Sequence, residues 1–185
     1  MSQEIVQDAE QRMGKALQVY QRDLATVRAG RASVSMLDKI TVEYYGSQMP
    51  VTQVATVNSP EPRMLVITPW DKSMLHEIER AIQKSDLGIN PNNDGIVIRL
   101  AVPALTEQRR QELVKVVHKM SEECRIAVRN IRRDANDALK KQEKAGALSE
   151  DELRRSADKI QALTDRFVNE IDKVTETKEA DILEV

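Results

Sequence analysis

Apolar residues recur at alternating spacings of three and four between Thr106 and Gly146, the longest such pattern in the chain. This spacing is typical of a helix that packs against other helices. The stretch contains no proline and no glycine before Gly146, and it is rich in strong helix formers. Its apolar positions are Leu113, Val117, Met120, Cys124, Ala127, Ile131 and Ala138. The pattern predicts a single helix about 60 Å long, around which the rest of the chain is organised.

Two further stretches carry a similar pattern, one at each end of the chain. Residues 3–28 predict a first helix that ends near Ala29, with Gly30 as its C-cap. A capping box, Ser149-Glu-Asp-Glu152, predicts the start of a third long helix. Its apolar positions are Leu153, Ala157, Ile160, Leu163, Phe167, Ile171 and Val174. Three amphipathic helices can bury their apolar faces together only as a bundle.

The intervening residues 31–103 change to the alternating pattern of strands. Strands are predicted over 40–45, 51–57, 64–68 and 96–102, with a short amphipathic helix over 73–85. The predicted fold is therefore α+β, with a three-helix bundle built from residues 1–30 and 104–185 and an inserted β/α/β domain over 31–103. Because only two chain crossings join these parts, the crossings are expected to act as a hinge.

A basic stripe is the main candidate for binding chemistry. Four arginines and no acidic residue occur between Cys124 and Arg133. At about 100° per residue, the stripe is predicted to lie roughly opposite the apolar positions. Its members are Arg125, Arg129, Arg132, Arg133 and Lys140. Unpaired guanidinium groups in a row favour an anionic partner, because each can donate two hydrogen bonds to a phosphate. The alternative is an ordinary solvated helix face.

The overall charge does not by itself indicate an RNA partner. The net charge is −2, but residues 106–145 carry 11 basic and 7 acidic groups (+4), whereas residues 149–185 carry 6 basic and 11 acidic groups (−5). The local stripe is therefore the argument for RNA. The single cysteine, Cys124, is predicted to be a small core residue, which leaves no intramolecular disulfide and no cysteine cluster for a metal. No signal sequence or membrane-spanning run is expected, so the predicted location is the cytoplasm.

The sequence contains no recognisable set of catalytic residues. His76 and His118 are not in a metal-spaced pair and are predicted to be surface residues, and the six glycines are isolated, so no phosphate-binding loop is predicted. Five aromatic residues provide no platform interleaved with basic residues for stacking bases. An enzyme is not expected, and any RNA contact should be to the backbone and its shape.

Five segments resemble the bacterial ribosome recycling factor family, in order and across essentially the whole chain. They are Val27-Arg-Ala-Gly-Arg-Ala-Ser33, Val42-Glu-Tyr-Tyr-Gly46, Ser85-Asp-Leu-Gly-Ile-Asn-Pro91, Leu105-Thr-Glu-Gln-Arg-Arg110 and Ala127-Val-Arg-Asn-Ile-Arg-Arg-Asp-Ala-Asn136. The last is the most specific. One departure is Val34, where proline usually follows Arg-Ala-Ser.

The resemblance implies an L-shaped, tRNA-like monomer without a cofactor or metal. Such proteins bind the ribosome after termination and, with elongation factor G and the GTP hydrolysis of that factor, split the subunits and release mRNA and deacylated tRNA. The implied contacts to large-subunit ribosomal RNA are Arg132 first, then Arg129 and Arg133, with Arg28 and Arg125 added; an ion pair to a helix carboxylate is the alternative for Arg28. The implied hinge residues are Gly30, Arg31, Ala32, Ser33, Pro103 and Ala104. Without the resemblance, a helical adaptor whose arginines meet an acidic protein would be the competing interpretation.

Overall fold

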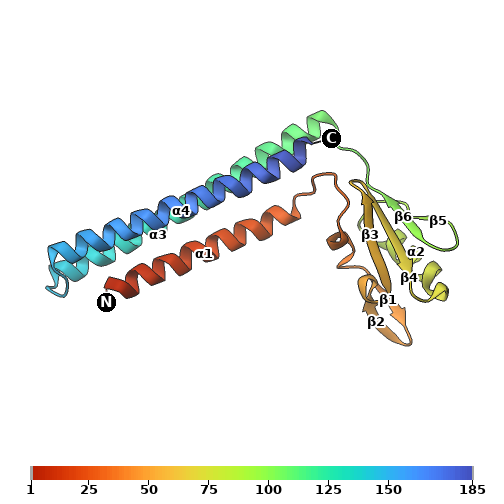
Figure 1. Ribbon diagram of the computed structural model, residues 1–185, viewed down its shortest axis with the longest axis horizontal. Helices are drawn as coiled ribbons and strands as arrows, with labels where there is room; N and C mark the ends of the chain where they lie inside the picture. Colours follow the sequence, from red (N-terminus) through yellow and green to blue (C-terminus); the bar gives the residue numbers. More distant parts are fainter. Residues whose placement is uncertain (1, 185) are drawn as a thin grey trace. The chain divides into compact units, whose positions relative to one another are not determined.

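The computed structural model describes residues 2–184, and the chain divides into two compact units. Of the described residues, 2–29 and 106–184 form a helical unit, and Gly30–Leu105 form a unit of strands with one short α-helix (Figure 1). The predicted α+β class is confirmed.

Three long helices make up the helical unit: α1 (Ser2–Thr26), α3 (Glu107–Lys144) and α4 (Glu150–Leu183). Helices α3 and α4 pack along one another, and α1 contacts both (Figure 1). With 38 residues, α3 is about 57 Å long. The three helices predicted from the apolar spacing are therefore present, and they bury one common core.

Local side-chain caps explain where α3 and α4 begin. The Thr106 hydroxyl accepts a hydrogen bond from the backbone N–H of Arg109, 3.2 Å away. At the start of α4, the predicted capping box is confirmed: the N–H of Glu152 donates to Ser149 Oγ (3.2 Å), and the N–H of Ser149 donates to the Glu152 carboxylate (2.9 Å). Between the helices Gly146 adopts a φ of +75°, as the predicted turn requires.

More positions of α3 are buried than the seven apolar positions, here called the seam, from which the helix was predicted. Leu113, Val117, Cys124 and Ile131 are buried as expected, but Met120, Ala127 and Ala138 are only half-buried. Five positions outside the seam are buried instead: Arg110, Ser121, Val128, Ala135 and Leu139. The reason is that α3 packs against two neighbours, so its buried sector spans both contacts rather than one narrow stripe.

The predicted end of α1 is wrong. The helix ends at Thr26, where the N–H of Val27 donates to the carbonyl of Leu24 and tightens the last turn. Gly30 therefore lies beyond the helix and is not its C-cap. Its φ of +74° belongs to the segment that begins the second unit.

The second unit contains two antiparallel sheets and helix α2 (Leu75–Lys84). A hairpin pairs β1 (Thr41–Tyr44) with β2 (Ser47–Pro50), and its two turn residues, Tyr45 and Gly46, both have positive φ. A four-stranded sheet has the order β3-β4-β6-β5. Its strands are β3 (Ala55–Glu61), β4 (Met64–Pro69), β5 (Asn92–Asn93) and β6 (Ile98–Ala101). Buried residues of both sheets and of α2 form one hydrophobic core within this unit.

Some strand predictions for this unit are wrong. The segment 51–57 is not one strand: Val51–Gln53 form a 3-10 turn, and β3 continues to Glu61 through Pro60. Proline is tolerated there because β3 lies at the edge of its sheet. Strands β2 and β5 were not predicted, because the β2 sequence Ser47-Gln-Met-Pro50 does not alternate between polar and apolar residues and β5 is only two residues long.

Candidate nucleic-acid interface

The predicted basic stripe lies beside helix α4 and not opposite the buried face of α3. Arg125 and Arg132 are half-buried, while Arg129 and Arg133 are exposed. Because α3 also packs against α4, the buried sector extends round to Arg125 and Arg132, the nearer edge of the stripe. The position predicted for the stripe is therefore wrong, although its members do follow one side of a long helix.

Arg125 is an interhelical residue. Its Nη2 and Nε donate to the same carboxylate oxygen of Asp172 on α4, at 2.6 and 3.1 Å, and its Nη1 lies 3.3 Å from Glu122. Burial acts to lower the pKa of Arg125, but the hydrogen bonds and charges of Asp172 and Glu122 outweigh it, so the pKa is raised. The expectation that every guanidinium in the stripe is unpaired is wrong for this residue.

The other three arginines are progressively less engaged. Arg129 Nη1 lies 3.2 Å from the Glu122 carboxylate, an exposed pair. Arg132 Nη1 donates to the neutral side chain of Gln161 on α4 at 3.3 Å. Within residues 2–184, Arg133 has no hydrogen-bond or ion-pair partner. Arg132 and Arg133 can thus turn toward a phosphate without breaking an ion pair.

Arg28 is exposed, two residues after the last residue of α1. The alternative of an ion pair to a helix carboxylate is wrong, since no such pair occurs among residues 2–184. Arg31, named above as a hinge residue, is also exposed, but it makes interactions of its own.

The residues of the expected hinge differ in how firmly they are held. The N–H of Ala32 donates to the carbonyl of Pro62 at 2.8 Å, and Ser33 caps a 3-10 turn at Val34–Leu37, so both belong to the fold of the second unit. A Cβ placed on Gly30 would lie 3.0 Å from Leu105 Cγ. Pro103 and Ala104 are exposed and outside any helix or strand.

A groove between α3 and α4 continues from the stripe toward the turn that joins the two helices. It encloses about 450 Å³, and its two cationic side chains are Lys140 and Arg154. Lys140 was part of the predicted stripe. Arg154 was missed because the acidic average of α4 hides its few basic positions, and only the pairing of the helices shows which of them faces α3.

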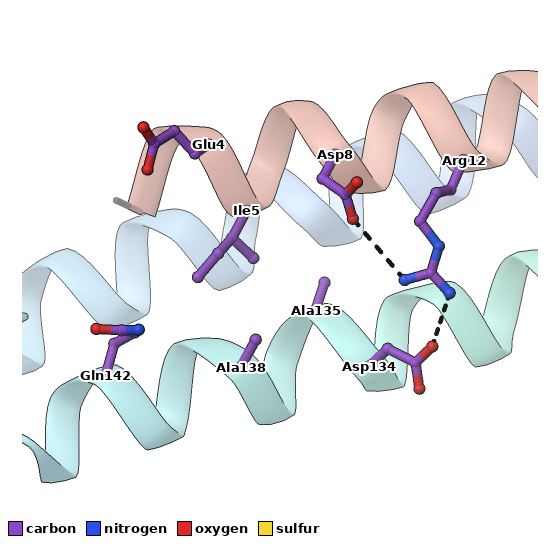
Figure 2. Close-up of a pocket in the computed structure, with 8 residues that line it drawn as sticks. All are labelled: Glu4, Ile5, Asp8, Arg12, Asp134, Ala135, Ala138 and Gln142. Atoms are coloured by element: carbon purple, nitrogen blue, oxygen red, sulfur yellow. Dashed lines mark hydrogen bonds and ion pairs between the residues drawn. The ribbon is translucent and has the colours of Figure 1, made fainter.

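A second groove, between α1 and α3, has the opposite character (Figure 2). It is lined by the carboxylates of Glu4, Asp8 and Asp134 and by one cation, Arg12. Figure 2 shows Arg12 bridging the two helices: Nη2 lies 2.8 Å from Asp134, and Nη1 lies 3.9 Å from Asp8. With three acids around one paired arginine, this groove disfavours phosphate, whereas on the α3–α4 side Arg132 and Arg133 have no carboxylate partner among residues 2–184.

The remaining reactive side chains form no shared site. His76 and His118 are exposed, as predicted, and each lies beside a glutamate, at 3.6 Å from Glu79 and 2.8 Å from Glu179. Cys124 is buried, as predicted, and burial raises the pKa of its thiol to about 11. Within residues 2–184, no three histidine, cysteine or carboxylate side chains are placed to hold a metal ion. No helix in that part of the chain is long and apolar enough to cross a membrane.

Comparisons with known proteins point to one family. The sequence model of the ribosome recycling factor family matches residues 20–183. A ribosome-recycling factor of Bacillus pumilus is 60% identical over 185 residues, covering 100% of both chains. A solution structure of a ribosome recycling factor superposes with a TM-score of 0.78 at 42% identity, covering 100% of this chain and 98% of the other. A further structure is described as the T. thermophilus ribosome recycling factor and the E. coli elongation factor G bound to the E. coli post-termination complex; it superposes with a TM-score of 0.66 at 45% identity and covers 100% of both chains.

Proposed function

This chain belongs to the ribosome recycling factor family, and from that membership we propose that it binds the ribosome after termination and acts there with elongation factor G. Hydrolysis of GTP by the elongation factor supplies the free energy. The outcome is separation of the subunits, with release of mRNA and deacylated tRNA for a new round of translation. The protein works in the cytoplasm as a monomer and hydrolyses no nucleotide itself.

The arginines of α3 support a contact to large-subunit ribosomal RNA. Arg132 is the first candidate for this contact, because its only hydrogen bond within residues 2–184 is to a neutral amide. Arg129 and Arg133 lie on either side of it along the sequence of α3. Guanidinium groups recognise phosphate through paired hydrogen bonds. Arg28 contributes a further exposed cation. Arg125 has a smaller share, because Asp172 already neutralises it.

Separate roles for the two units complete the mechanism. The helical unit is the anchor on RNA, and α3, a single 38-residue helix, transmits force along its length. The unit formed by Gly30–Leu105 receives the push of elongation factor G and turns about the two chain crossings. Because Ala32 and Ser33 are tied into that unit, the turning is confined to Arg28–Arg31 and to the segment around Pro103 and Ala104.

Subunit splitting tests this function directly. Post-termination ribosomes are mixed with the protein, elongation factor G and GTP, and splitting is followed by light scattering. Wild type should split them, and Arg132→Glu should not, while its circular dichroism remains that of a helical protein. Arg22→Glu on α1 is the matched control, since Arg22 is exposed and lies outside the stripe.

Each outcome has a definite meaning. Failure of the wild type to split ribosomes would refute the function and favour the adaptor interpretation. Full activity of Arg132→Glu would keep the function but refute the anchor. Equal loss in Arg22→Glu would show that the assay responds to net charge rather than to the stripe.

A further inference from the structure

Strand β1 pairs with β2 along one edge, and its outer edge pairs with no strand among residues 2–184. In an antiparallel pair, residues that bond across the ladder alternate with residues whose N–H and C=O point away from it. The tight turn places Tyr44 in a bonded pair with the first residue of β2, and at the other end the N–H of Val51 donates to the carbonyl of Ile40 at 3.1 Å. The backbone groups of Thr41 and Glu43 therefore point outward, and they form no hydrogen bond with residues 2–184.

The other strand edges of this unit carry a proline or are very short. Pro50 ends β2 opposite Thr41, so its ring nitrogen lies on the outer side of the hairpin. Strand β3 contains Pro60 and an irregular register, and β5 is only two residues long. Prolines and bulges of this kind prevent an edge strand from pairing with another chain. Strand β1 has neither, so its outer edge is open to pairing.

A groove of about 430 Å³ lies between β1 and α2. Every residue from Lys39 to Glu43 lines it, which residues on both faces of a strand can do together only through the backbone edge. On the opposite side the groove is lined by residues of α2 spaced at three and four, Glu77, Arg80, Ala81 and Lys84. Ala81 is half-buried against the core of the unit. A chain that enters this groove therefore meets backbone groups on one side and side chains on the other.

The charges of the groove favour an occupant with net negative charge. Arg80 lies 3.8 Å from Glu77, so these two charges offset one another. Lys39 and Lys84 have no carboxylate partner among residues 2–184, and Glu43 has no cationic partner there. Two unpaired cations against one unpaired carboxylate complement an acidic segment.

We infer that the outer edge of β1 is a docking site for an extended, acidic segment of a partner protein, which adds a third strand to the hairpin. This goes beyond the proposed function, which assigns no partner to the groove. The N–H and C=O groups of Thr41 and Glu43 pair with the backbone of the segment, and Lys39 and Lys84 attract its carboxylates. In this mode of recognition the main-chain hydrogen bonds provide affinity and the side chains provide specificity.

The same observations argue against RNA as the occupant. A phosphate accepts hydrogen bonds from N–H groups but has no donor for the outward carbonyls of Thr41 and Glu43. Two carboxylates, Glu43 and Glu77, also line the groove. A peptide backbone supplies donors and acceptors in alternation, so it satisfies both kinds of group on the strand edge.

Peptide titration of the isotope-labelled whole chain tests this site. The probe is an acetylated and amidated pentapeptide in which glutamate and valine alternate, and the NMR shifts of the backbone amides of Thr41 and Glu43 report binding. Two control peptides separate the two parts of the recognition. Replacing the glutamates with lysine reverses the charge, and replacing the valines with proline keeps the charge but removes backbone N–H groups.

Two pairs of variants test the same parts from the side of the protein. Glu43→Pro removes an outward N–H that is not in the ladder with β2, at an edge position where proline is tolerated. Glu43→Ala is its control, because it removes the same carboxylate and keeps the N–H. Lys39→Glu reverses an unpaired charge of the groove, and Lys72→Glu is its control, an exposed lysine of the same unit outside the groove. Unfolding followed by Trp70 fluorescence checks that each variant is folded.

The glutamate–valine peptide should shift the amides of Thr41 and Glu43, and neither control peptide should do so. It should bind Glu43→Ala at least as tightly as the wild type, and it should bind Glu43→Pro about tenfold more weakly, the effect of one hydrogen bond left unmade. Lys39→Glu should weaken binding more than Lys72→Glu. A wild type without these shifts would overturn the inference, as would equal binding of either control peptide. Wild-type affinity in folded Glu43→Pro, or equal losses in Lys39→Glu and Lys72→Glu, would overturn it as well.

Discussion

Arg125 of α3 donates two hydrogen bonds to a single carboxylate oxygen of Asp172 on α4, at 2.6 and 3.1 Å. The two residues are 47 positions apart, and the side chain of Arg125 is 21% exposed against 43% for Asp172. A pair of this kind neutralises a cation that would otherwise belong to the basic stripe. It therefore distinguishes Arg125, which joins two helices, from Arg132 and Arg133, which have no carboxylate partner among residues 2–184.

The first prediction is that this pair contributes to stability more than to ribosome binding. Asp172→Asn should lower the free energy of unfolding of the helical unit by about 1 kcal/mol, since a charge-assisted hydrogen bond is partly screened by solvent here. Urea unfolding followed by circular dichroism at 222 nm measures it. Asp158 is an exposed carboxylate of α4 without a partner in residues 2–184, so Asp158→Asn should change the free energy of unfolding little. Equal effects of the two substitutions would show that the pair contributes nothing.

A second prediction concerns salt. Each phosphate contact adds to the steepness with which binding weakens as ionic strength rises. Arg132→Gln and Arg133→Gln should each reduce the slope of log K against log salt by about one, whereas Arg125→Gln should leave it nearly unchanged because Asp172 already neutralises that side chain. The measurement is binding to large subunits from low to moderate salt. A slope reduced as much by Arg125→Gln as by Arg132→Gln would place Arg125 on the RNA after all.

The contrast between Arg125 and Arg132 shows what the sequence could and could not reveal. The extent of α3 was predictable, because apolar spacing, the Thr106 cap and Gly146 are all local signals. The partner of Arg125 was not, because it depends on which face of α4 meets α3, and α4 begins 25 residues later. The additional buried positions of α3 could not be predicted for the same reason. The apolar spacing of a sequence shows that a helix packs against something, but it does not show how many helices it contacts.

Very short strands and the surroundings of single atoms could not be predicted from the sequence either. Strand β5 is two residues long and exists only because Asn92 and Asn93 pair with β6. The Oδ1 atom of Asn136 is buried without a hydrogen bond from residues 2–184, which could not be predicted because the sequence of a helix does not show what surrounds a single asparagine. By contrast, the family resemblance could be recognised from the sequence alone, because it depends only on which residues occur in the five segments and on the order of those segments along the chain.

A third prediction isolates the contact between Gly30 and Leu105. Gly30→Ala and Gly88→Ala both put a side chain on a residue with positive φ, +74° and +67°, and each should cost about 1 kcal/mol for that reason. Only the Gly30 side chain would also approach Leu105, with its Cβ at 3.0 Å from Cγ, whereas nothing lies within 4 Å of a Cβ at Gly88. Gly30→Ala should therefore be the less stable variant, in thermal unfolding followed by fluorescence of Trp70, the single tryptophan of the chain and a residue of the same unit.

The same two variants test the hinge. If the crossing at Gly30 must flex, Gly30→Ala should bind ribosomes like the wild type yet split them more slowly, and Gly88→Ala should do both normally. Loss of binding and splitting together in Gly30→Ala would contradict separate roles for the two units.

A fourth prediction follows from Asp94, at the turn before β6. The backbone N–H of Val97, the guanidinium of Arg99 and the N–H of Ile96 all donate to its carboxylate and lower its pKa from 3.8 to about 2. A carboxylate whose pKa is lower in the folded state stabilises the fold above its unfolded pKa, and that stabilisation is lost as the pH falls through the folded value. Asp94→Asn should therefore be less stable than the wild type at pH 6, and the difference should shrink below about pH 4 and vanish only below about pH 2.

Unfolding by urea at a series of pH values, followed by Trp70 fluorescence, measures this difference for the unit that contains both residues. Asp86→Asn is the control, since Asp86 is exposed in the same unit and has no partner among residues 2–184. A difference between Asp94→Asn and the wild type that stays constant from pH 6 to pH 2 would mean that the turn depends on the shape of the side chain and not on its charge. In that case the Asn side chain would be failing as an acceptor at every pH, and the bond from Arg99 would contribute no electrostatic stabilisation.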